Sequence, residues 1–276
     1  MSQLIRNISV IVLTKNEEAG IAITLENLRG FEEVVVVDSA STDKTLEICN
    51  QAGVRIVEYK WDGAYPKKKQ WSLQNAGVRN DWVLLLDADE YPTESLFEEL
   101  STLDATILRS DFGAFDLNLS YHFLGKELRH GHLVTKRSLT HRFRAAYPNV
   151  ADLEAPGIRE VEGHYQPQTS YQVGRLRRRL VHNDKDSIAS WFDRHNRYSD
   201  WEAYLLVNPE ARESIRNLRS TKGQLFDLVP MKPLVFFLYS YFFRFGFLDG
   251  REGFAYSFAL AFYYWQIRIK ALQLLK

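Results

Sequence analysis

The feature that most constrains this fold is a series of short apolar runs that can be buried on both faces. Three of them, Ile8 to Leu13, Val34 to Val37 and Trp82 to Leu86, are rich in valine, isoleucine and leucine, as the strands of a parallel sheet are. Segments of helical period, Glu17 to Leu28 and Lys67 to Val78, lie between them. Strands that alternate with helices predict a doubly wound α/β domain with a mainly parallel sheet.

Composition allows one large domain, or one domain with an appendage. Of the 276 residues, 45% are hydrophobic and 25% are charged, which excludes disordered and fibrous proteins. The 35 Lys and Arg residues balance 35 Asp and Glu residues, so no overall positive charge indicates a nucleic-acid partner. The single cysteine, Cys49, cannot form an intramolecular disulfide, and the first residues lack the pattern of a signal peptide. We therefore expect a cytoplasmic protein.

The last 46 residues differ from the rest of the chain, because they hold fifteen of its 37 aromatic residues. Two apolar stretches, Leu234 to Phe243 and Phe254 to Ile267, are each shorter than the ~20 residues of a membrane-spanning helix. We expect a helical hairpin that lies in a membrane interface, with basic residues near anionic lipid. The chain then divides into an α/β domain, residues 1–222, and a membrane-associating segment, residues 223–276. The alternative is a pair of helices buried in a core or a dimer.

The third apolar run ends in two carboxylates, Asp87 and Asp89, with one residue between them. Open α/β sheets bind ligands at the carboxyl ends of their strands. Carboxylates held close together suit Mg²⁺ or Mn²⁺, which would bridge them to a diphosphate. His182, at the end of another predicted strand, could complete this metal site. The alternatives are a polar strand end that starts a turn before Pro92, and an ordinary polar histidine.

Polar side chains also follow the first two strands, at the same edge of the predicted sheet. They are Thr14, Asn16, Glu17, Asp38, Ser39 and Ser41. Small polar groups and backbone amides at successive strand ends can hold a nucleotide base and ribose, with Asp38 as a hydrogen-bond acceptor. Each residue alone could be a helix cap, but three polar strand ends at one edge are harder to explain as caps. The pattern therefore predicts a nucleotide site.

With these motifs the chain resembles the family 2 glycosyltransferases, whose nucleotide-sugar-binding fold is called GT-A. The matching residues are Ile8 to Glu18, Val34 to Asp43 and Val83 to Glu90. Within this family it is most similar to the bacterial lipopolysaccharide-core β-1,4-glucosyltransferase group and its exopolysaccharide relatives. That closer resemblance is carried by residues 69–73, 123–125, 129–131, 141–143, 174–176, 182, 196–198 and 246–250.

The resemblance implies inverting transfer of a hexose such as glucose from a UDP-sugar to a lipopolysaccharide-core or lipid-linked envelope glycan. It places Thr14, Glu17, Asp38 and Lys69 near the nucleotide. It places Asp87 and Asp89 near the metal and the donor sugar. Such an enzyme would be a peripheral protein on the inner face of the bacterial cytoplasmic membrane.

An inverting transfer needs one base, which takes the proton of the attacking acceptor hydroxyl. Where the core-glucosyltransferase group carries a His-Glu pair, this chain reads Arg-Glu-Val-Glu at residues 159–162. Glu162 or Glu160 is therefore the candidate base. The alternative is that both are solvated loop carboxylates.

Arg129, His130 and Arg142 could hold the diphosphate or a phosphorylated acceptor, because guanidinium groups match phosphate geometry, or they could be surface charge.

Two rival functions stay open. A sugar-phosphate nucleotidyltransferase would want a glycine-rich phosphate loop, which Thr14 to Gly20 does not supply. The other rival is a non-catalytic membrane adaptor of the same fold, and intact Asp87 and Asp89 argue against it.

Overall fold

The computed structural model describes residues 4–162, 165–216, 218, 226 and 229–276, which form two compact units. The first, here called the sheet unit, comprises Met1–Tyr121, Val134–Pro148 and Glu160–Lys185. The second, the helical unit, comprises His122–Leu133, Asn149–Arg159 and Asp186–Lys276. Each unit is therefore assembled from separate stretches of chain. The expected boundary between residues 222 and 223 lies outside the described residues.

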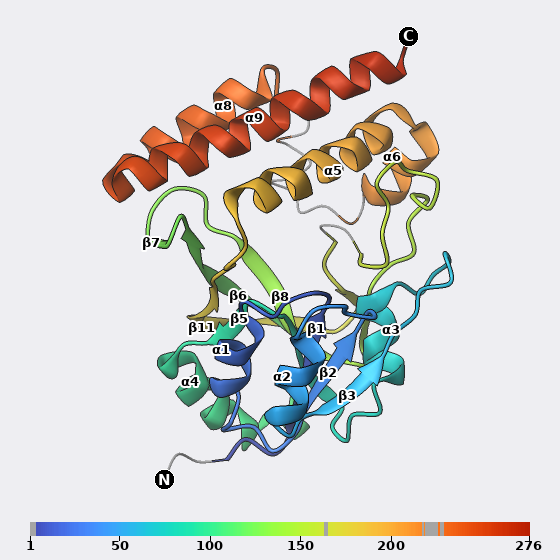
Figure 1. The fold of residues 1–276 in the computed structure, drawn as a ribbon, viewed down its shortest axis with the longest axis vertical. Coiled ribbons are helices and arrows are strands. Elements are labelled where there is room, and N and C mark those ends of the chain that lie inside the picture. The colour runs from blue at the N-terminus through green and yellow to red at the C-terminus, as the bar shows by residue number, and fades with distance from the viewer. Residues whose placement is uncertain (1–3, 163–164, 217, 219–225, 227–228) are drawn as a thin grey trace. The chain divides into compact units, whose positions relative to one another are not determined.

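Four parallel strands form one side of the sheet, in the order β3-β2-β1-β4 (Figure 1). They are β1 (Ile8–Thr14), β2 (Val34–Asp38), β3 (Arg55–Glu58) and β4 (Trp82–Asp87). Thr14 pairs with Asp38, and Leu13 pairs with Asp87. Because the strand order reverses between β1 and β4, the carboxyl ends of these strands flank the crevice where such sheets bind ligands. The predicted parallel α/β sheet is confirmed.

The sheet continues from β4 through strands of mixed direction, in the order β8-β6-β11-β5. They are β5 (Glu90–Pro92), β6 (Phe112–Phe123), β8 (Thr135–His141) and β11 (Gln172–His182). The shorter strands are β7 (Lys126–Leu128), β9 (Ala145–Ala146) and β10 (Gln168–Thr169). β8 runs antiparallel to β4 and lies where the sequence predicts no strand.

Helices cover both faces of the sheet, because its central strands are apolar on both sides. They are α1 (Ile21–Glu26), α2 (Thr45–Gln51), α3 (Lys68–Asn75), α4 (Glu94–Asp104) and the 3₁₀ turn Ile107–Arg109. On one face Val10 and Val12 pack in a core with Leu25 and Leu96. On the other face Ile11 and Leu13 pack with Leu73 of α3. Alternate residues of β1 thus fill two separate cores.

The helical unit is built around its C-terminal helix, which lies along α5 and α8 (Figure 1). Its elements are α5 (Ile188–Val207), α6 (Pro209–Arg216), α8 (Lys232–Leu238), a π turn (Tyr239–Phe243), a 3₁₀ turn (Gly246–Asp249) and α9 (Gly250–Leu274). Lys270 of α9 forms an ion pair with Asp200 of α5 at 2.6 Å. Within the described ranges, no helix combines the length and the apolar character needed to cross a bilayer. The predicted C-terminal helical segment is confirmed.

Candidate functional site

Polar residues at the ends of β1 and β2 form one hydrogen-bonded network. Thr14 Oγ1 donates to Asp38 Oδ1 at 2.8 Å. The backbone N–H and the hydroxyl of Ser41 donate to the same carboxylate at 2.8 and 2.5 Å, and the Asn16 N–H donates to Ser41 Oγ at 2.8 Å. Asp38 is buried, so these donors compensate for the water that it loses. The structure therefore brings four of the predicted nucleotide residues together.

Glu17 and Ser39, which also belong to the predicted nucleotide set, flank this network. The Glu17 N–H donates to Thr45 Oγ1 at 2.7 Å, which ties the end of β1 to the start of α2. Ser39 follows β2 directly and is buried, and its hydroxyl has no hydrogen-bond partner among the residues that the structure describes. A buried hydroxyl without a partner is uncommon in proteins. Ser39 Oγ is thus a buried polar atom beside the network that the described residues leave unsatisfied.

The first turn of α3 carries two lysines to the same edge. Lys68 Nζ donates to the backbone carbonyl of Thr14 at 2.6 Å. Lys69 Nζ lies 4.0 Å from Asp87 Oδ1. Burial lowers the pKa of Lys68 to about 8, although the carboxylates of Asp38 and Glu160 act in the opposite direction. Lys69 is a predicted residue of this site, whereas Lys68 is not among the residues predicted from the sequence.

Glu160 and Glu162, the candidate bases, both reach the start of α3. The two carboxylate oxygens of Glu162 accept the backbone N–H groups of Lys69 and Gln70, each at 2.8 Å. Glu162 is only 3% exposed, and burial raises its pKa. Glu160 forms an ion pair with Lys15 at 2.8 Å. Burial favours its neutral form, but the hydrogen bond from Lys15 prevails and lowers the pKa of Glu160.

Asp87 is held by lysines. Lys136 Nζ lies 2.7 Å from Asp87 Oδ2 and also pairs with Glu90, which in turn accepts the backbone N–H of Asp87 at 2.9 Å. Burial acts to raise the pKa of Asp87, but Lys136 and Lys69 hold it well below its usual range. Lys136 comes from β8, and the sequence analysis missed both the strand and the residue. Thr135–His141 contains a single apolar residue, Leu139, so its sequence has no alternating pattern that would predict a strand.

Asp89 and His182 face each other beside this cluster. Asp89 Oδ1 lies 3.4 Å from His182 Nδ1, and that buried nitrogen has no hydrogen-bond partner in the described part of the chain. The imidazole stacks on Tyr121, with 4.7 Å between the ring centroids. Burial raises the pKa of Asp89 to about 6. Burial acts to lower the pKa of His182, but Asp89 and Glu90 raise it to about 9.

Asp89 and His182 are the two predicted metal ligands that lie side by side. Two ligands of an octahedral ion, each about 2.1 Å from it, lie about 3 Å apart, which is close to the separation of Asp89 Oδ1 and His182 Nδ1. Asp87, the third predicted ligand, is paired with Lys136 instead. In the described ranges no three His, Cys, Asp or Glu side chains are grouped so that they could hold a metal.

Arg129 and His130 are used inside the helical unit. Their backbone N–H groups donate to the Asp249 carboxylate at 3.2 and 2.8 Å, and His130 Nδ1 lies 3.0 Å from Asp249 Oδ1. Asp249 directly precedes α9 and is buried. Two of the three residues predicted to bind phosphate therefore help to fix the start of α9, Arg129 through its backbone N–H and His130 through its backbone and its ring.

Arg142 lies at the opposite end of β4 from Asp87. It follows β8, whose last residue, His141, pairs with Trp82 at the start of β4. Five residues of strand, about 16 Å, separate Trp82 from Asp87. The Arg142 N–H donates to the Asp81 carbonyl at 2.9 Å, and its guanidinium packs on Phe143. The structure therefore does not bring Arg142 to the predicted nucleotide site.

Comparison with known proteins identifies relatives of the sheet unit. Residues 9–105 match the family model described as Glycosyl transferase family 2. An uncharacterized glycosyltransferase of Rickettsia typhi is 32% identical over 123 residues, which are 44% of this chain and 41% of that protein. The lipopolysaccharide core biosynthesis glycosyltransferase LpsC of Rhizobium meliloti is 34% identical over 101 residues, 35% of this chain and 36% of that protein. The chain thus spans about two fifths of the length of these curated relatives.

A solved structure resembles nearly the whole chain. It is the mannosyltransferase PcManGT from Pyrobaculum calidifontis, in complex with GDP-Man and Mn²⁺. It has a TM-score of 0.50 and 15% sequence identity, and the likeness covers 96% of this chain and 87% of that one. This likeness confirms the predicted GT-A fold.

Proposed function

Because residues 9–105 match the family model described as Glycosyl transferase family 2, we propose that the protein is an inverting glycosyltransferase that takes a hexose, such as glucose, from a UDP-sugar. One observation carries the proposal. The ends of β1, β2, β4 and β11 bring a hydrogen-bonded polar network, a lysine-bound carboxylate and a facing Asp-His pair to one edge of the sheet. That edge is where open α/β sheets bind nucleotides.

In this proposal, the donor lies across the ends of β1, β2 and β4. The nucleoside contacts the network of Thr14, Asn16, Asp38 and Ser41, with the Ser39 hydroxyl as a donor or acceptor for it. Asp87, kept ionised by Lys136, accepts hydrogen bonds from sugar hydroxyls, while Lys69 faces the diphosphate. A fixed carboxylate and ammonium group orient the donor before the acceptor arrives.

Asp89 and His182 would hold a Mg²⁺ or Mn²⁺ ion. When bound, such an ion neutralises the charge that develops on a diphosphate leaving group. Protein sites for these ions often supply few ligands and leave the other positions to phosphate oxygens and water. The position of His182 Nδ1, 3.4 Å from Asp89 Oδ1, supports this assignment.

We assign the base to Glu160 rather than to Glu162. Both oxygens of Glu162 already accept N–H groups of α3. Glu160 has one oxygen paired with Lys15, and its lowered pKa keeps it ionised at neutral pH, as a base must be. The acceptor oxygen would bond to the anomeric carbon as the bond to UDP breaks on the opposite face. Its proton would then pass to Glu160.

The acceptor in this proposal is a lipopolysaccharide-core or other lipid-linked envelope glycan. The name of LpsC, which is similar to this chain over 101 residues, supports the class. Such an acceptor is anchored in a bilayer, so an enzyme that lies on the same surface gains effective concentration. We therefore place the protein on the inner face of the cytoplasmic membrane.

A panel of UDP-hexoses tests the donor and the metal pair together. Purified protein with Mn²⁺ should slowly hydrolyse its donor to UDP and free sugar, measured as UDP release. Asp89→Asn should abolish that release, while Asp81→Asn should retain it, because Asp81 lies at the other end of β4. Release from none of the UDP-hexoses, or equal release by Asp89→Asn and wild type, would contradict the proposal.

A further inference from the structure

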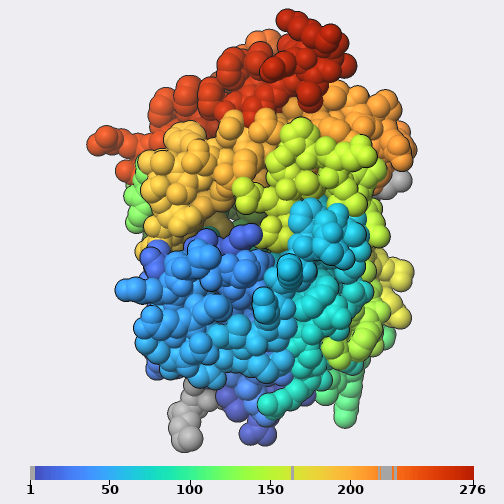
Figure 2. Space-filling view, turned by 45° about the vertical axis from the view of Figure 1, so that its right-hand side comes forward, coloured from blue at the N-terminus to red at the C-terminus, as the bar shows by residue number. Residues whose placement is uncertain are grey.

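We propose that the helical unit docks on a bilayer interface that contains anionic lipid, through the outer sides of α8, α9 and the turn between them. The docking surface belongs to the helical unit alone. Its role, to bring the enzyme to a lipid-linked acceptor, rests on the proposed function. α9 lies on the outside of that unit (Figure 2).

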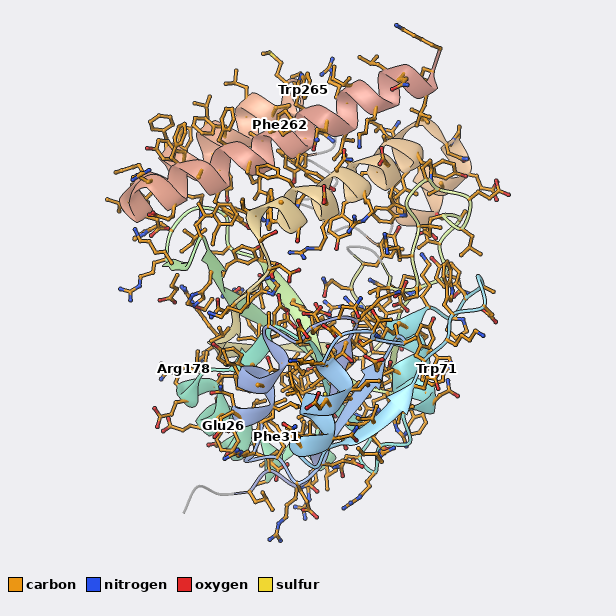
Figure 3. All side chains as sticks on the ribbon, viewed as in Figure 1. Glu26, Phe31, Trp71, Arg178, Phe262 and Trp265 are labelled. Atoms are coloured by element: carbon orange, nitrogen blue, oxygen red, sulfur yellow. The ribbon has the colours of Figure 1, made fainter. Side chains whose placement is uncertain are left out.

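The first part of the surface is a stripe along α9. It consists of Phe254, Phe258, Phe262, Trp265, Ile269 and Leu272, which are between 40% and 56% exposed. At 100° per residue, these six side chains fall within about 80° of arc. Phe262 and Trp265 lie on the outer side of the helix, with their rings stacked (Figure 3). The buried residues Tyr256 and Tyr263 belong to its other sides.

A helix in a water-soluble protein usually buries one apolar side and exposes a polar one. α9 instead has a second apolar side, which runs over most of its length and remains exposed. A continuous exposed apolar surface of this kind marks an interaction site.

The second part of the surface is the tip of the hairpin, where α8 leads into α9. Its residues are Phe242, Phe243, Phe245, Phe247 and Leu248, which are between 43% and 75% exposed. Ring contacts of Tyr241 with Phe247 and with Phe254 join the tip to the stripe. The tip and the stripe therefore form one continuous apolar surface.

The backbone conformation of the tip is fixed by specific contacts. Phe245 has φ 60°, a conformation that bulky residues rarely adopt. The turn closes through a hydrogen bond between Ser240 and Ser257 at 3.0 Å. A Cβ on Gly253 would lie 2.1 Å from the carbonyl oxygen of Gly246, so only glycine allows this approach. The fold therefore presents the exposed phenylalanines on a fixed support.

The charge around the surface favours an anionic lipid as its partner. Residues 231–276 contain six basic and two acidic residues. Both acids are engaged, because Asp249 is buried against Arg129 and His130 and Glu252 pairs with Lys126 at 3.3 Å. Positive charge beside exposed aromatic residues matches the headgroup region of a bilayer with anionic lipid.

A second copy of the chain fits this surface less well. Arg244, Arg251 and Arg268 are exposed on the tip and on α9. A two-fold contact applies the same patch to itself, so it would bring these arginines near one another without acids to pair them. Because the stripe runs along α9, the helix axis would lie parallel to the membrane plane.

Flotation with vesicles tests the proposal on the full chain. Wild-type protein should float with vesicles of phosphatidylcholine and phosphatidylglycerol, and less with phosphatidylcholine alone. Phe243→Glu and Phe258→Glu should each lower the vesicle partition coefficient at least ~10-fold, since each places a charge where a ring was buried in lipid. Phe143→Glu is the matched control, because Phe143 is 71% exposed but belongs to the sheet unit. It should bind as wild type does.

Circular dichroism and UDP release check each variant, and both should remain at the wild-type level because the changed side chains are exposed. Equal flotation of all variants, or no flotation of wild type, would overturn the proposal. A different result would show an interface between copies instead. In that case the wild-type protein would be dimeric by light scattering and would not bind vesicles, and the Phe243→Glu variant would be monomeric. Vesicle binding without any UDP release would leave the docking surface standing and remove the proposed activity.

Discussion

At the residue scale, two glutamates that lie two positions apart have different surroundings. Glu162 closes the N-terminal turn of α3 with both of its oxygens. Glu160 pairs with Lys15, and its backbone carbonyl accepts the N–H of Lys68 at 2.6 Å. A helix leaves its first N–H groups without partners in the helix. The carboxylate of Glu162 therefore supports α3, while that of Glu160, which makes no such contact with α3 among the described residues, is the base in our proposal.

Glutamine variants separate these two roles. Glu160→Gln should lower the turnover number for sugar transfer by ~10²-fold, because the amide cannot accept the proton, with the melting temperature unchanged. Glu162→Gln should lower the free energy of unfolding by ~1–3 kcal/mol, because its amide NH₂ group would face an N–H donor. Steady-state kinetics measure the turnover number of both variants, and thermal melts measure their stability. Wild-type turnover in Glu160→Gln would refute the assignment of the base.

Lys68 gives the protein a stability that depends on pH in the alkaline range. Burial lowers its pKa from 10.5 in the unfolded chain to about 8. Between these pH values the unfolded chain binds the proton and the folded protein does not, so stability rises with pH. The wild-type free energy of unfolding should therefore gain about 2–3 kcal/mol over this range relative to Lys68→Met. Denaturant titrations at both ends of the range measure the difference, and parallel pH profiles would contradict it.

At the element scale, the crossing of the 3₁₀ turn and α9 depends on glycine. The Gly253 Cα lies so close to the backbone of Gly246 that a methyl group would overlap its oxygen. Hydrogen bonds from Arg129 and His130 to Asp249 hold the same crossing from outside. The hairpin is thus fixed by backbone packing as well as by its apolar side chains.

Alanine at Gly253 should therefore loosen this crossing. Gly253→Ala should lower the free energy of unfolding by ~1–3 kcal/mol, as overpacked sites do, and should weaken vesicle binding. Gly20→Ala is the matched control, because a Cβ there has no atom within 4 Å. Urea unfolding curves of the two variants measure the effect. Equal urea midpoints for the two variants would show that the crossing accommodates the methyl group without a loss of stability.

At the scale of the whole molecule, the helical unit is not a C-terminal appendage. It includes His122–Leu133 and Asn149–Arg159 as well as Asp186–Lys276. Trp191 of α5 packs against Phe123, and Phe123 packs against Tyr256 of α9, with ring centroids 5.5 and 5.2 Å apart. Removal of α8 and α9 would therefore expose the apolar side of α5.

A truncation after residue 222 tests this view of the unit. The shortened protein should aggregate or melt at a lower temperature, because buried aromatic residues of α5 would meet water. Size-exclusion chromatography and thermal melts, with the full chain as reference, measure the outcome. A monomeric truncated protein with an unchanged melting temperature would show that the remaining segments fold on their own.

The sequence by itself determined the parallel part of the sheet and the edge that carries the candidate site. Strands such as Ile8–Thr14 and Trp82–Asp87 follow from local hydrophobic pattern, because the burial of a strand on both faces is visible in its own residues. A parallel sheet then brings their carboxyl ends to one edge, which places Thr14 and Asp87 there.

Only the tertiary structure decided which charges meet at that edge. Lys136 reaches Asp87 across 49 residues of chain, and Glu162 reaches the Lys69 N–H across 93. The antiparallel direction of β8 carried Arg142 to the opposite end of β4 from Asp87. Hydrophobic period records how deeply a residue is buried. It carries no information about which distant polar group will lie beside it, because that depends on strand order, direction and register.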